Sequence, residues 1–533
     1  MEYNVKAILF DTRSIQKYIF SGNKLRTNIG ASYIVDQVFE TTLRQVIAKV
    51  IPNLDWDSWK KGDGTEHIVP LKADCYVAYI GGGNALLLFK DDISVDLKSI
   101  VTTFTKSLLT TYPGLKTGAA IGELDFTTQD TYDASLGVLF KKLKQYQSTV
   151  FPVVNIPYTG LTLPCEVNGE AANFYDATGY EIGVEAGDSR YYSQEVWAKT
   201  QASDKANKHL QELFKQELEG KQFPKELNQL GQKDTEQDIA IVHIDGNQMG
   251  VRFSQTKKLA ERSALSHQVK EKTIHAFRNL LRDVVKEYDS YADYLDLHDG
   301  YLPIRPLILG GDDVTFVCAA RVAVTYARRF MNYMNTDDKI IKIGPSTIHT
   351  CAGIAILPQA YPFFRGYELA EHLCGAAKGE SRKTKKGSSW LDYAILHGEQ
   401  APELAQIREN EYTGAIGKAG GMHFGPYRVD IDDDVRSLKK VLDCATELAN
   451  YPQSKVKDMR TVLQLGKHDI SQYVQQLHHL GQNLPHIDGW DDFEETLWYQ
   501  KPGSSDIRTP YVDAIELLDY LPNVKADDTK GEN

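Results

Sequence analysis

Short apolar runs broken by glycine and aspartate dominate the pattern of hydrophobic and polar positions in the second half of the chain. The clearest is PLILGGDDVTFVC at 306–318, where two runs of β-branched and large hydrophobic residues flank Gly-Gly-Asp-Asp. Glycine adopts positive φ at little cost, so this pattern predicts a tight β-hairpin. A second apolar run, at 239–244, predicts a strand that ends at Asp245, where Gly246 and Asn247 break the pattern.

The positions between and after these runs follow helical and strand spacing. Residues 254–288 carry a long helical pattern, 350–358 predict a further strand, and 367–378 predict an amphipathic helix. Strand, helix, hairpin and later strand, in this order, are typical of the palm domains of nucleotide polymerases and cyclases. We therefore predict an α+β, ferredoxin-like palm domain over residues 238–398.

The first part of the chain repeats this order. Apolar runs at 7–11, 76–89 and 117–122 predict a strand ending in aspartate, a hairpin and a later strand. The spacings between these features differ by only a few residues from those of the second half. The sequence therefore predicts an internal duplication, with a first palm domain over residues 1–150.

The remaining segments predict helical modules around the two palm domains. Residues 151–237 start in loops and become polar and helical, which predicts a connecting module, and residues 399–523 predict a helical C-terminal domain. The polar end, 524–533, is expected to be disordered. Several domains are expected in a chain of 533 residues, since a single core rarely exceeds about 250–300 residues.

The predicted hairpin in the second half lifts two adjacent carboxylates, Asp312 and Asp313, to the edge of a buried sheet. Acidic oxygens are the ligands that Mg²⁺ prefers, and Asp245 supplies a third carboxylate. A strand end and a neighbouring hairpin tip can hold two metal ions roughly 3.5–4 Å apart. We predict a catalytic site at these three aspartates, with two Mg²⁺ or Mn²⁺ ions held by them and Ile244. The alternative is an ordinary acidic turn.

The first copy of the pattern lacks this chemistry. Gly83 and Asn84 stand where the second copy has its aspartate pair, and neither brings a negative charge to a metal. Asp11 alone cannot hold two cations, so the first palm is predicted to be catalytically silent. Gly81, Gly82 and Asn84 are nevertheless candidates for lining a nucleotide pocket.

These motifs resemble the large polymerase-cyclase subunit of type III CRISPR effector complexes and, more distantly, diguanylate cyclases. The resemblance rests on IQKYIFSGNKLRTNIGAS at 15–32, IDGNQMG at 244–250, PIRPLILGGDDVTFV at 303–317, AGIAILPQAYPF at 352–363 and AEHLCGAAK at 370–378. It implies a degenerate first palm that binds an acceptor nucleotide and faces an active second palm holding a donor triphosphate.

The resemblance also implies nucleotide-binding roles for Gly246, Asn247, Gly310, Gly311 and Lys378. The helix lysine of that family meets triphosphate oxygens, and this role carries over to Lys378; a solvated helix-end cation is the alternative. The implied activity joins nucleoside triphosphates, most readily ATP, into cyclic or linear oligonucleotide messengers of antiviral defence. Two alternatives stay open: a non-enzymatic scaffold subunit of an RNA-guided complex, and a synthase of a cyclic dinucleotide or an AMP conjugate.

Composition and charge limit the kinds of partner that the chain is expected to bind. The net charge of −12 argues against broad electrostatic binding of nucleic acid by the isolated chain, although guide-RNA complex subunits and target RNA stay possible partners. No apolar run approaches the roughly 20 residues of a membrane span, and the N-terminus lacks a signal-peptide profile. We expect a cytoplasmic protein without a membrane partner.

Two modules found in many relatives are expected to be missing. The six cysteines contain no C-x-x-C pair, so neither structural zinc nor disulfides are predicted. Cys165 resembles the remnant of the family's zinc module without its ligands, but we interpret it as a plain core or loop thiol. The chain opens directly into the first palm, and its histidines show no ligand spacing. A histidine-aspartate nuclease is therefore not predicted.

Overall fold

The computed structural model describes most of the chain, and every structural statement below concerns the described residues. They are residues 3–149, 158–176, 191–231, 238–384, 387–396, 403–416, 420–482, 484–490, 493, 496–500, 503 and 505–522. The expected disordered tail at 524–533 lies outside them, as do 150–157, 177–190 and 232–237 around the expected connecting module.

The first sheet has the strand order β2-β3-β4-β1-β5. Its strands are β1 (Asn4–Arg13), β2 (Leu54–Asp55), β3 (Cys75–Gly81), β4 (Asn84–Phe89) and β5 (Lys116–Asp125). The central strand β1 is antiparallel to both β4 and β5. Its apolar run is fully buried, and Phe10 packs against the rings of Phe39 and Phe104. Strand β1 is longer at both ends than the predicted 7–11, because its pairing with β5 runs from Asn4 to Arg13.

Helices pack around this first sheet. They are α1 (Ile15–Phe20), α2 (Leu25–Gln37), η1 (Val38–Leu43), α3 (Arg44–Ala48), η2 (Ser58–Lys61), α4 (Leu97–Thr111) and α5 (Gln129–Gln147). Helix α5 lies along β5 and β1, and α4 also contacts β5.

The second sheet has the strand order β13-β12-β11-β8-β10-β9. Its strands are β8 (Asp238–Gly246), β9 (Ile304–Gly310), β10 (Asp313–Ala319), β11 (Thr350–Pro358), β12 (Trp390–Ile395) and β13 (Tyr427–Arg428). All neighbours are antiparallel except β11 and β12. The prediction that the first of these strands ends at Asp245 is wrong by one residue, because Gly246 still pairs with Thr350.

The two sheets share one topology. In each, four strands taken in chain order lie side by side in the order fourth, first, third, second, which is the ferredoxin-like arrangement (β5-β1-β4-β3 and β11-β8-β10-β9). The α+β fold class is therefore confirmed.

The helices of the second palm are α8 (Met249–Ser254), α9 (Leu259–Lys286), α10 (Tyr288–Leu295), η4 (Ala320–Val322), α11 (Ala323–Met334) and α12 (Phe363–Ser381). The single helix predicted over 254–288 is wrong at its start. Lys258 is extended, and the Glu261 side chain accepts hydrogen bonds from the backbone N–H groups of Lys257 and Lys258, so a new helix begins at Leu259.

The described part of the connecting segment contains β6 (Phe174–Tyr175), β7 (Tyr191–Tyr192), α6 (Gln194–Leu213), α7 (Lys215–Leu218) and η3 (Leu227–Leu230). Helix α6 packs closely along α2 of the first palm. The approach is possible because position 30 is glycine: a Cβ atom at Gly30 would lie only 1.7 Å from the backbone oxygen of Lys199.

The C-terminal segment is mainly helical. It contains α13 (Leu404–Glu411), α14 (Leu438–Leu448), α15 (Gln453–Leu463), α16 (Lys467–His479), β14 (Tyr499–Gln500), β15 (Ile507–Arg508), α17 (Tyr511–Leu517) and η6 (Leu518–Tyr520). His423 joins this segment to the second sheet, since its Nδ1 lies 2.8 Å from Asp513 and its Nε2 lies 2.8 Å from Asp392 on β12.

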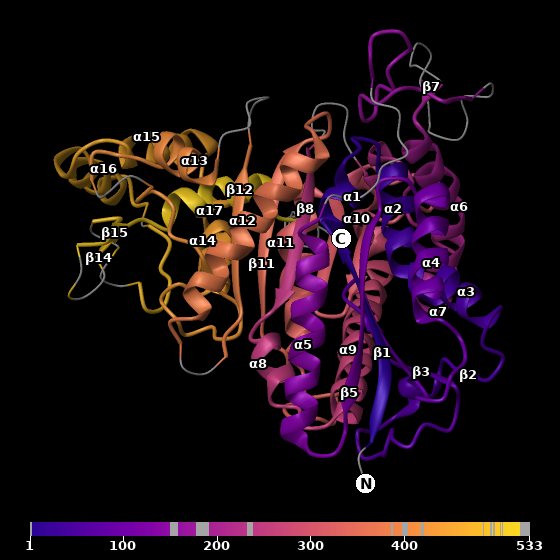
Figure 1. The fold of residues 1–533 in the computed structure, drawn as a ribbon. Coiled ribbons are helices and arrows are strands. Elements are labelled where there is room, and N and C mark those ends of the chain that lie inside the picture. The colour runs from indigo at the N-terminus through magenta and orange to yellow at the C-terminus, as the bar shows by residue number, and fades with distance from the viewer. Residues whose placement is uncertain are drawn as a thin grey trace.

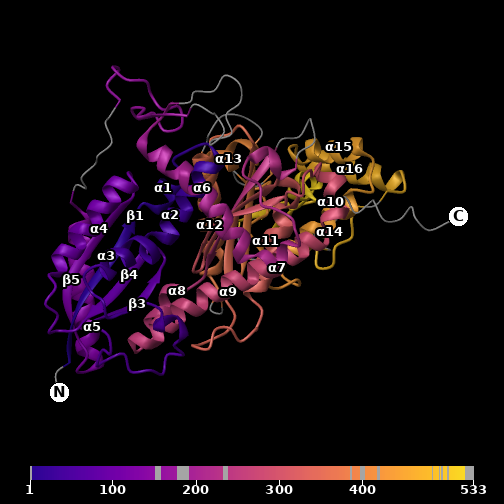
Figure 2. The same cartoon turned by 90° about the vertical axis from the view of Figure 1, so that its right-hand side faces the viewer.

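The three parts lie in a row, with the second palm in the middle (Figures 1 and 2). One cluster of buried hydrophobic side chains runs through all of them. Between the palms, Phe20 of α1 stacks on Phe363 and Tyr367 of α12, with centroid separations of 5.6 and 4.2 Å. None of the described helices has both the length and the apolar character needed to span a membrane.

Candidate active site

The Gly-Gly-Asp-Asp segment forms the tip of the β9–β10 hairpin. Gly310 pairs with Asp313, so Gly311 and Asp312 make a two-residue turn. Gly311 has a φ of +71°, a conformation that favours glycine. Its carbonyl accepts a hydrogen bond from the hydroxyl of Thr273 on α9, which fixes the hairpin tip against that helix.

The structure brings the three predicted aspartates together. Asp245 lies on β8, next to β10, and therefore reaches the same edge of the sheet as Asp313. Gly246 gives Asp312 the room to approach, because a Cβ atom at Gly246 would lie 2.8 Å from the Cβ of Asp312. All three carboxylates line one cleft of about 800 Å³.

Burial and mutual repulsion disfavour the ionised forms of Asp312 and Asp313. Burial, together with the charges of Asp245 and Asp312, raises the pKa of Asp313 to about 8. Burial and the charge of Asp245 likewise raise the pKa of Asp312 to about 6. The imidazole Nδ1 of His243 lies 3.5 Å from Asp313 Oδ1, but burial lowers the pKa of His243 to about 4, so this ring is neutral at pH 7.

The donor chemistry of the cluster fits divalent cations. Asp313 Oδ1 is buried and has no hydrogen-bond partner among the described residues. An unpaired buried carboxylate oxygen is costly, and a hard cation with oxygen ligands removes that cost. No group of three or more His, Cys, Asp or Glu side chains in the described part of the chain is arranged to hold an ion as it stands.

Lys378 forms an ion pair with the carboxylate of Asp245. It lies in the last turn of α12, and its ammonium group donates to Asp245 Oδ2. Although burial lowers the pKa of Lys378, the hydrogen bond and charge of Asp245 raise it overall. The lysine predicted to meet a triphosphate is therefore held at the site by one of the predicted metal ligands.

Two other predicted residues lie behind the site. The amide of Asn247 donates to the Ser388 carbonyl at 2.8 Å and to the Ser381 hydroxyl at 3.1 Å, so it fastens the segment after α12. Asn247 is not among the residues that line the cleft. The side chain of Ile244 is fully buried, so only its backbone is available to an ion.

The first palm presents a matching hairpin to the same cleft. Gly81 pairs with Asn84 between β3 and β4, and the turn residues Gly82 and Gly83 have φ values of +59° and +79°. Gly81 and Gly82 line the main cleft together with Gly310 and Gly311 of the other hairpin. With Asn84, they also line a smaller adjoining cleft of about 360 Å³.

The aspartate of the first palm is paired with a neutral group. The amide of Gln147, the last residue of α5, donates to Asp11 Oδ2. This pair occupies the position that Lys378 and Asp245 hold in the second palm, since each joins the helix after the later strand to the first strand. Burial raises the pKa of Asp11, although the Gln147 hydrogen bond and Arg13 oppose that effect.

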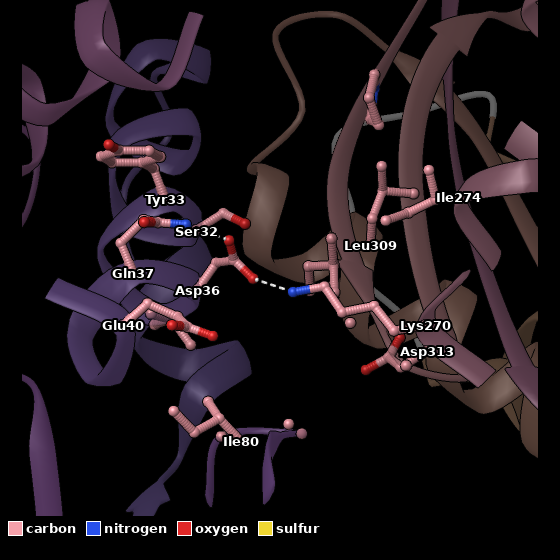
Figure 3. A pocket seen from close by; sticks show the side chains of 18 of the residues that line it. Ser32, Tyr33, Asp36, Gln37, Glu40, Ile80, Lys270, Ile274, Leu309 and Asp313 are labelled. Atoms are coloured by element: carbon pink, nitrogen blue, oxygen red, sulfur yellow. Dashed lines mark hydrogen bonds and ion pairs between the residues drawn. The ribbon is translucent and has the colours of Figure 1, made fainter. Parts of the chain in front are cut away.

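Helix α9 connects the two hairpins. Near its start the Ser263 hydroxyl donates to the carbonyl of Ala78 on β3, and three turns later Thr273 donates to Gly311. At a rise of about 1.5 Å per residue, these two anchors are about 15 Å apart. Between them, Lys270 forms an ion pair across the cleft with Asp36 of α2, with Nζ 3.0 Å from Oδ1 (Figure 3).

Sequence reasoning missed these supporting residues. Gln147, Ser263, Thr273, Asp36 and Lys270 belong to no motif, and each acts through a partner distant in sequence. The one available signal was the spacing of Arg262, Ser266 and Lys270 at four-residue intervals, which places polar groups on one face of a helix.

Residues 238–386 match the family model described as Cas10/Cmr2, second palm domain. The matched segment runs from the start of β8 to just beyond α12 and contains the three aspartates and Lys378. The resemblance to the large subunit of type III CRISPR effector complexes is thus confirmed over the second palm domain. No curated protein matches the sequence.

Solved structures with a similar arrangement include the Csm1–Csm4 cassette in complex with cA4, at a TM-score of 0.45 and 11% identity, covering 97% of this chain and 70% of that chain. The cassette in complex with pppApApA matches at a TM-score of 0.46 and 11% identity, covering 97% of this chain and 69% of that chain. Csm1 of T. onnurineus matches at a TM-score of 0.44 and 11% identity, covering 98% of this chain and 70% of that chain.

Proposed function

We propose that this protein is a metal-dependent nucleotidyltransferase that joins nucleoside triphosphates into short cyclic or linear oligonucleotides. The observation that carries the proposal is the cluster of Asp245, Asp312 and Asp313, in which burial and like charges raise the pKa of both Asp312 and Asp313 and which faces the glycine hairpin of the first palm across one cleft. In the reaction, a ribose 3′-oxygen forms a bond to an α-phosphorus, the bond to the β-phosphate breaks, and pyrophosphate and a proton are released.

Asp245, Asp312 and Asp313 would hold two Mg²⁺ or Mn²⁺ ions, with the backbone of Ile244 beside them. Such ions neutralise the leaving pyrophosphate and lower the pKa of an attacking hydroxyl. The chain's own contribution is positional. The tip glycines carry no side chains that would keep phosphates from the backbone, and Thr273 holds the catalytic hairpin in place.

For the substrate we propose ATP, and for the products antiviral second messengers. Both rest on the sequence resemblance and on the family match of residues 238–386. On this view Lys378 exchanges Asp245 for triphosphate oxygens, and the first palm's Gly81, Gly82 and Asn84 border the acceptor nucleotide. Subunits of a guide-RNA complex and target RNA are proposed partners on the same grounds.

The test is incubation of the purified protein with each nucleoside triphosphate and Mg²⁺, with products resolved by mass spectrometry. We expect oligonucleotide products from the wild type and none from the Asp312→Asn, Asp313→Asn double variant. The matched control is Asp432→Asn with Asp433→Asn, an adjacent and exposed aspartate pair away from the cleft. Undiminished product from the cleft variant would refute the assignment of the site.

A non-enzymatic subunit of an RNA-guided complex is the second candidate. The observation in its favour is the Lys378–Asp245 ion pair, which neutralises one of the predicted metal ligands. The same assay separates the two: a scaffold makes no product even when guide and target RNA are supplied. Co-purification of guide RNA would support membership of a complex under either function. A cyclic dinucleotide or an AMP conjugate would appear as a different mass in the same experiment.

A further inference from the structure

The ion pair between Asp36 and Lys270 lies in the cleft between the two palms, where a substrate would have to pass (Figure 3). Asp36 belongs to α2 of the first palm, and Lys270 belongs to α9 of the second. Both side chains are 39% exposed. The second carboxylate oxygen of Asp36 accepts a hydrogen bond of 2.7 Å from the Gln37 amide.

Lys270 also belongs to a polar stripe on α9. Arg262, Ser266 and Lys270 follow one another at intervals of four residues, so they lie on one face of the helix, spread over about 12 Å. All three line the smaller cleft, together with the tips of both hairpins. Ser266 touches the first of these tips, since a Cβ atom at Gly81 would lie 3.2 Å from its hydroxyl.

The two cations of this stripe have few competing partners. Arg262 forms no ion pair with any described residue, and the hydrogen bond from its guanidinium group to the Phe253 carbonyl is long at 3.5 Å. Lys270 has the Asp36 carboxylate as its near partner. Glu40, another acidic residue of the same cleft, is already engaged by the Trp56 indole N–H at 2.9 Å and by Lys60 at 3.0 Å.

Acidic clefts bind polyphosphates poorly unless cations are supplied on the side away from the metals. The aspartate cluster lies at the second hairpin, whereas on α9 Arg262 adjoins the anchor of the first hairpin, Ser263, and Lys270 lies between the two anchors. The backbone positions of Arg262 and Lys270 are about 12 Å apart along the helix axis, and the ammonium and guanidinium groups of their long side chains each form charge-assisted hydrogen bonds with phosphate oxygens.

We propose that Lys270 and Arg262 form a phosphate-binding stripe for the nucleoside triphosphate on the first-palm side, and that Asp36 holds Lys270 until this nucleotide arrives. The inference rests on the proposed function, since it concerns a substrate of the same cleft. An exposed ion pair contributes little net stability, so a phosphate with several negative charges displaces the single carboxylate.

Binding of α,β-methylene ATP with Mg²⁺, measured by isothermal titration calorimetry, tests the stripe without turnover, because this analogue cannot be cleaved at the bond that nucleotidyl transfer breaks. We expect Lys270→Met to weaken binding about tenfold, as for the loss of one good charged contact, and Lys270→Arg to restore most of it. We expect Asp36→Asn to tighten binding on the order of threefold, because the neutral amide no longer competes for Lys270.

The sign of the Asp36→Asn effect separates this role from a merely structural one. If the pair only ties the palms together, both variants weaken binding and lower the melting temperature, and the proposal is overturned. Lys286→Met is the matched control, since Lys286 is an exposed lysine at the far end of the same helix and outside both clefts. A wild type that binds no nucleotide would refute the proposed function, whereas wild-type binding unaffected by Lys270→Met would refute the stripe alone.

Discussion

Asp313 offers the sharpest test of the proposed active site, because it is a predicted metal ligand whose ionised form is destabilised by burial and by its neighbours. Its pKa is raised from 3.8 to about 8, so the folded protein holds a proton that the unfolded chain has lost at neutral pH. At about 1.4 kcal/mol per pKa unit, a shift of this size corresponds to roughly 6 kcal/mol of lost stability above pH 8. The side chain is 30% exposed, so water screens part of this cost, and we expect about 1–3 kcal/mol.

Proton linkage gives the direction in which the stability changes with pH. Between the unfolded pKa near 4 and the folded pKa near 8, the native state binds more protons than the unfolded state, so stability falls as the pH rises through this window. Asp313→Asn removes the titrating group. In EDTA the variant should therefore melt a few degrees above the wild type at pH 8, and the difference should shrink towards pH 5.

Mg²⁺ should reverse this order. The ion compensates the carboxylates of the wild type, so it should raise the melting temperature of the wild type at pH 8 and have less effect on Asp313→Asn. The assay is thermal unfolding of both proteins at pH 5 and pH 8, each with EDTA and with Mg²⁺. The reasoning fails if the variant is less stable than the wild type in EDTA at pH 8, or if Mg²⁺ stabilises both proteins equally.

Two further predictions concern the frame that carries the site. His423→Gln should cost about 3–5 kcal/mol, because it breaks a buried pair with Asp392 and Asp513. Although burial and Arg408 lower the pKa of His423, the two carboxylates raise it overall. The stabilisation by His423 is therefore complete below about pH 6.5 and is lost as the pH rises through the raised pKa. Urea unfolding measures the difference in unfolding free energy between the wild type and the variant, and a difference that grew with pH would contradict this prediction. Gly30→Ala should destabilise the α2–α6 contact by about 1–3 kcal/mol, because the added Cβ meets the α6 backbone. Gly137→Ala in α5 is the matched control, because nothing lies within 4 Å of the added Cβ. In thermal unfolding this control should be neutral or slightly stabilising. Equal losses of stability in the two variants would refute the packing argument.

The sequence was sufficient for the hairpins and for the order of strands, because these features depend on local chemistry. Glycine at 81–83 and 310–311 marks turns that few other residues form, and the flanking apolar runs are long enough to be assigned as strands. The topology followed from the repeat of one pattern in both halves. The start of α9 was missed because it depends on Glu261 reaching back to the backbone of Lys257 and Lys258, a contact that hydrophobic spacing does not encode.

The cleft itself could not be read from the sequence. Asp36 and Lys270 are separated by more than two hundred residues, and neither lies in a motif. Asn247 is the converse case, since it lies in a motif beside Asp245, whereas its amide donates to Ser381 and Ser388 behind the site. Position in a motif indicates proximity along the chain, whereas the direction of a side chain is set by the strand and by its partners.

The two palms share one topology but differ in the group that pairs with the aspartate near the end of the first strand. In the second palm, Asp245 is neutralised by a cation, Lys378, which a polyphosphate can attract away. In the first palm, the corresponding Asp11 is capped by the neutral amide of Gln147, which carries no charge to exchange. The amide gives the carboxylate one hydrogen bond, and burial still raises the pKa of Asp11. The glycine hairpin of the first palm is left free to serve as a wall of the cleft that both palms form.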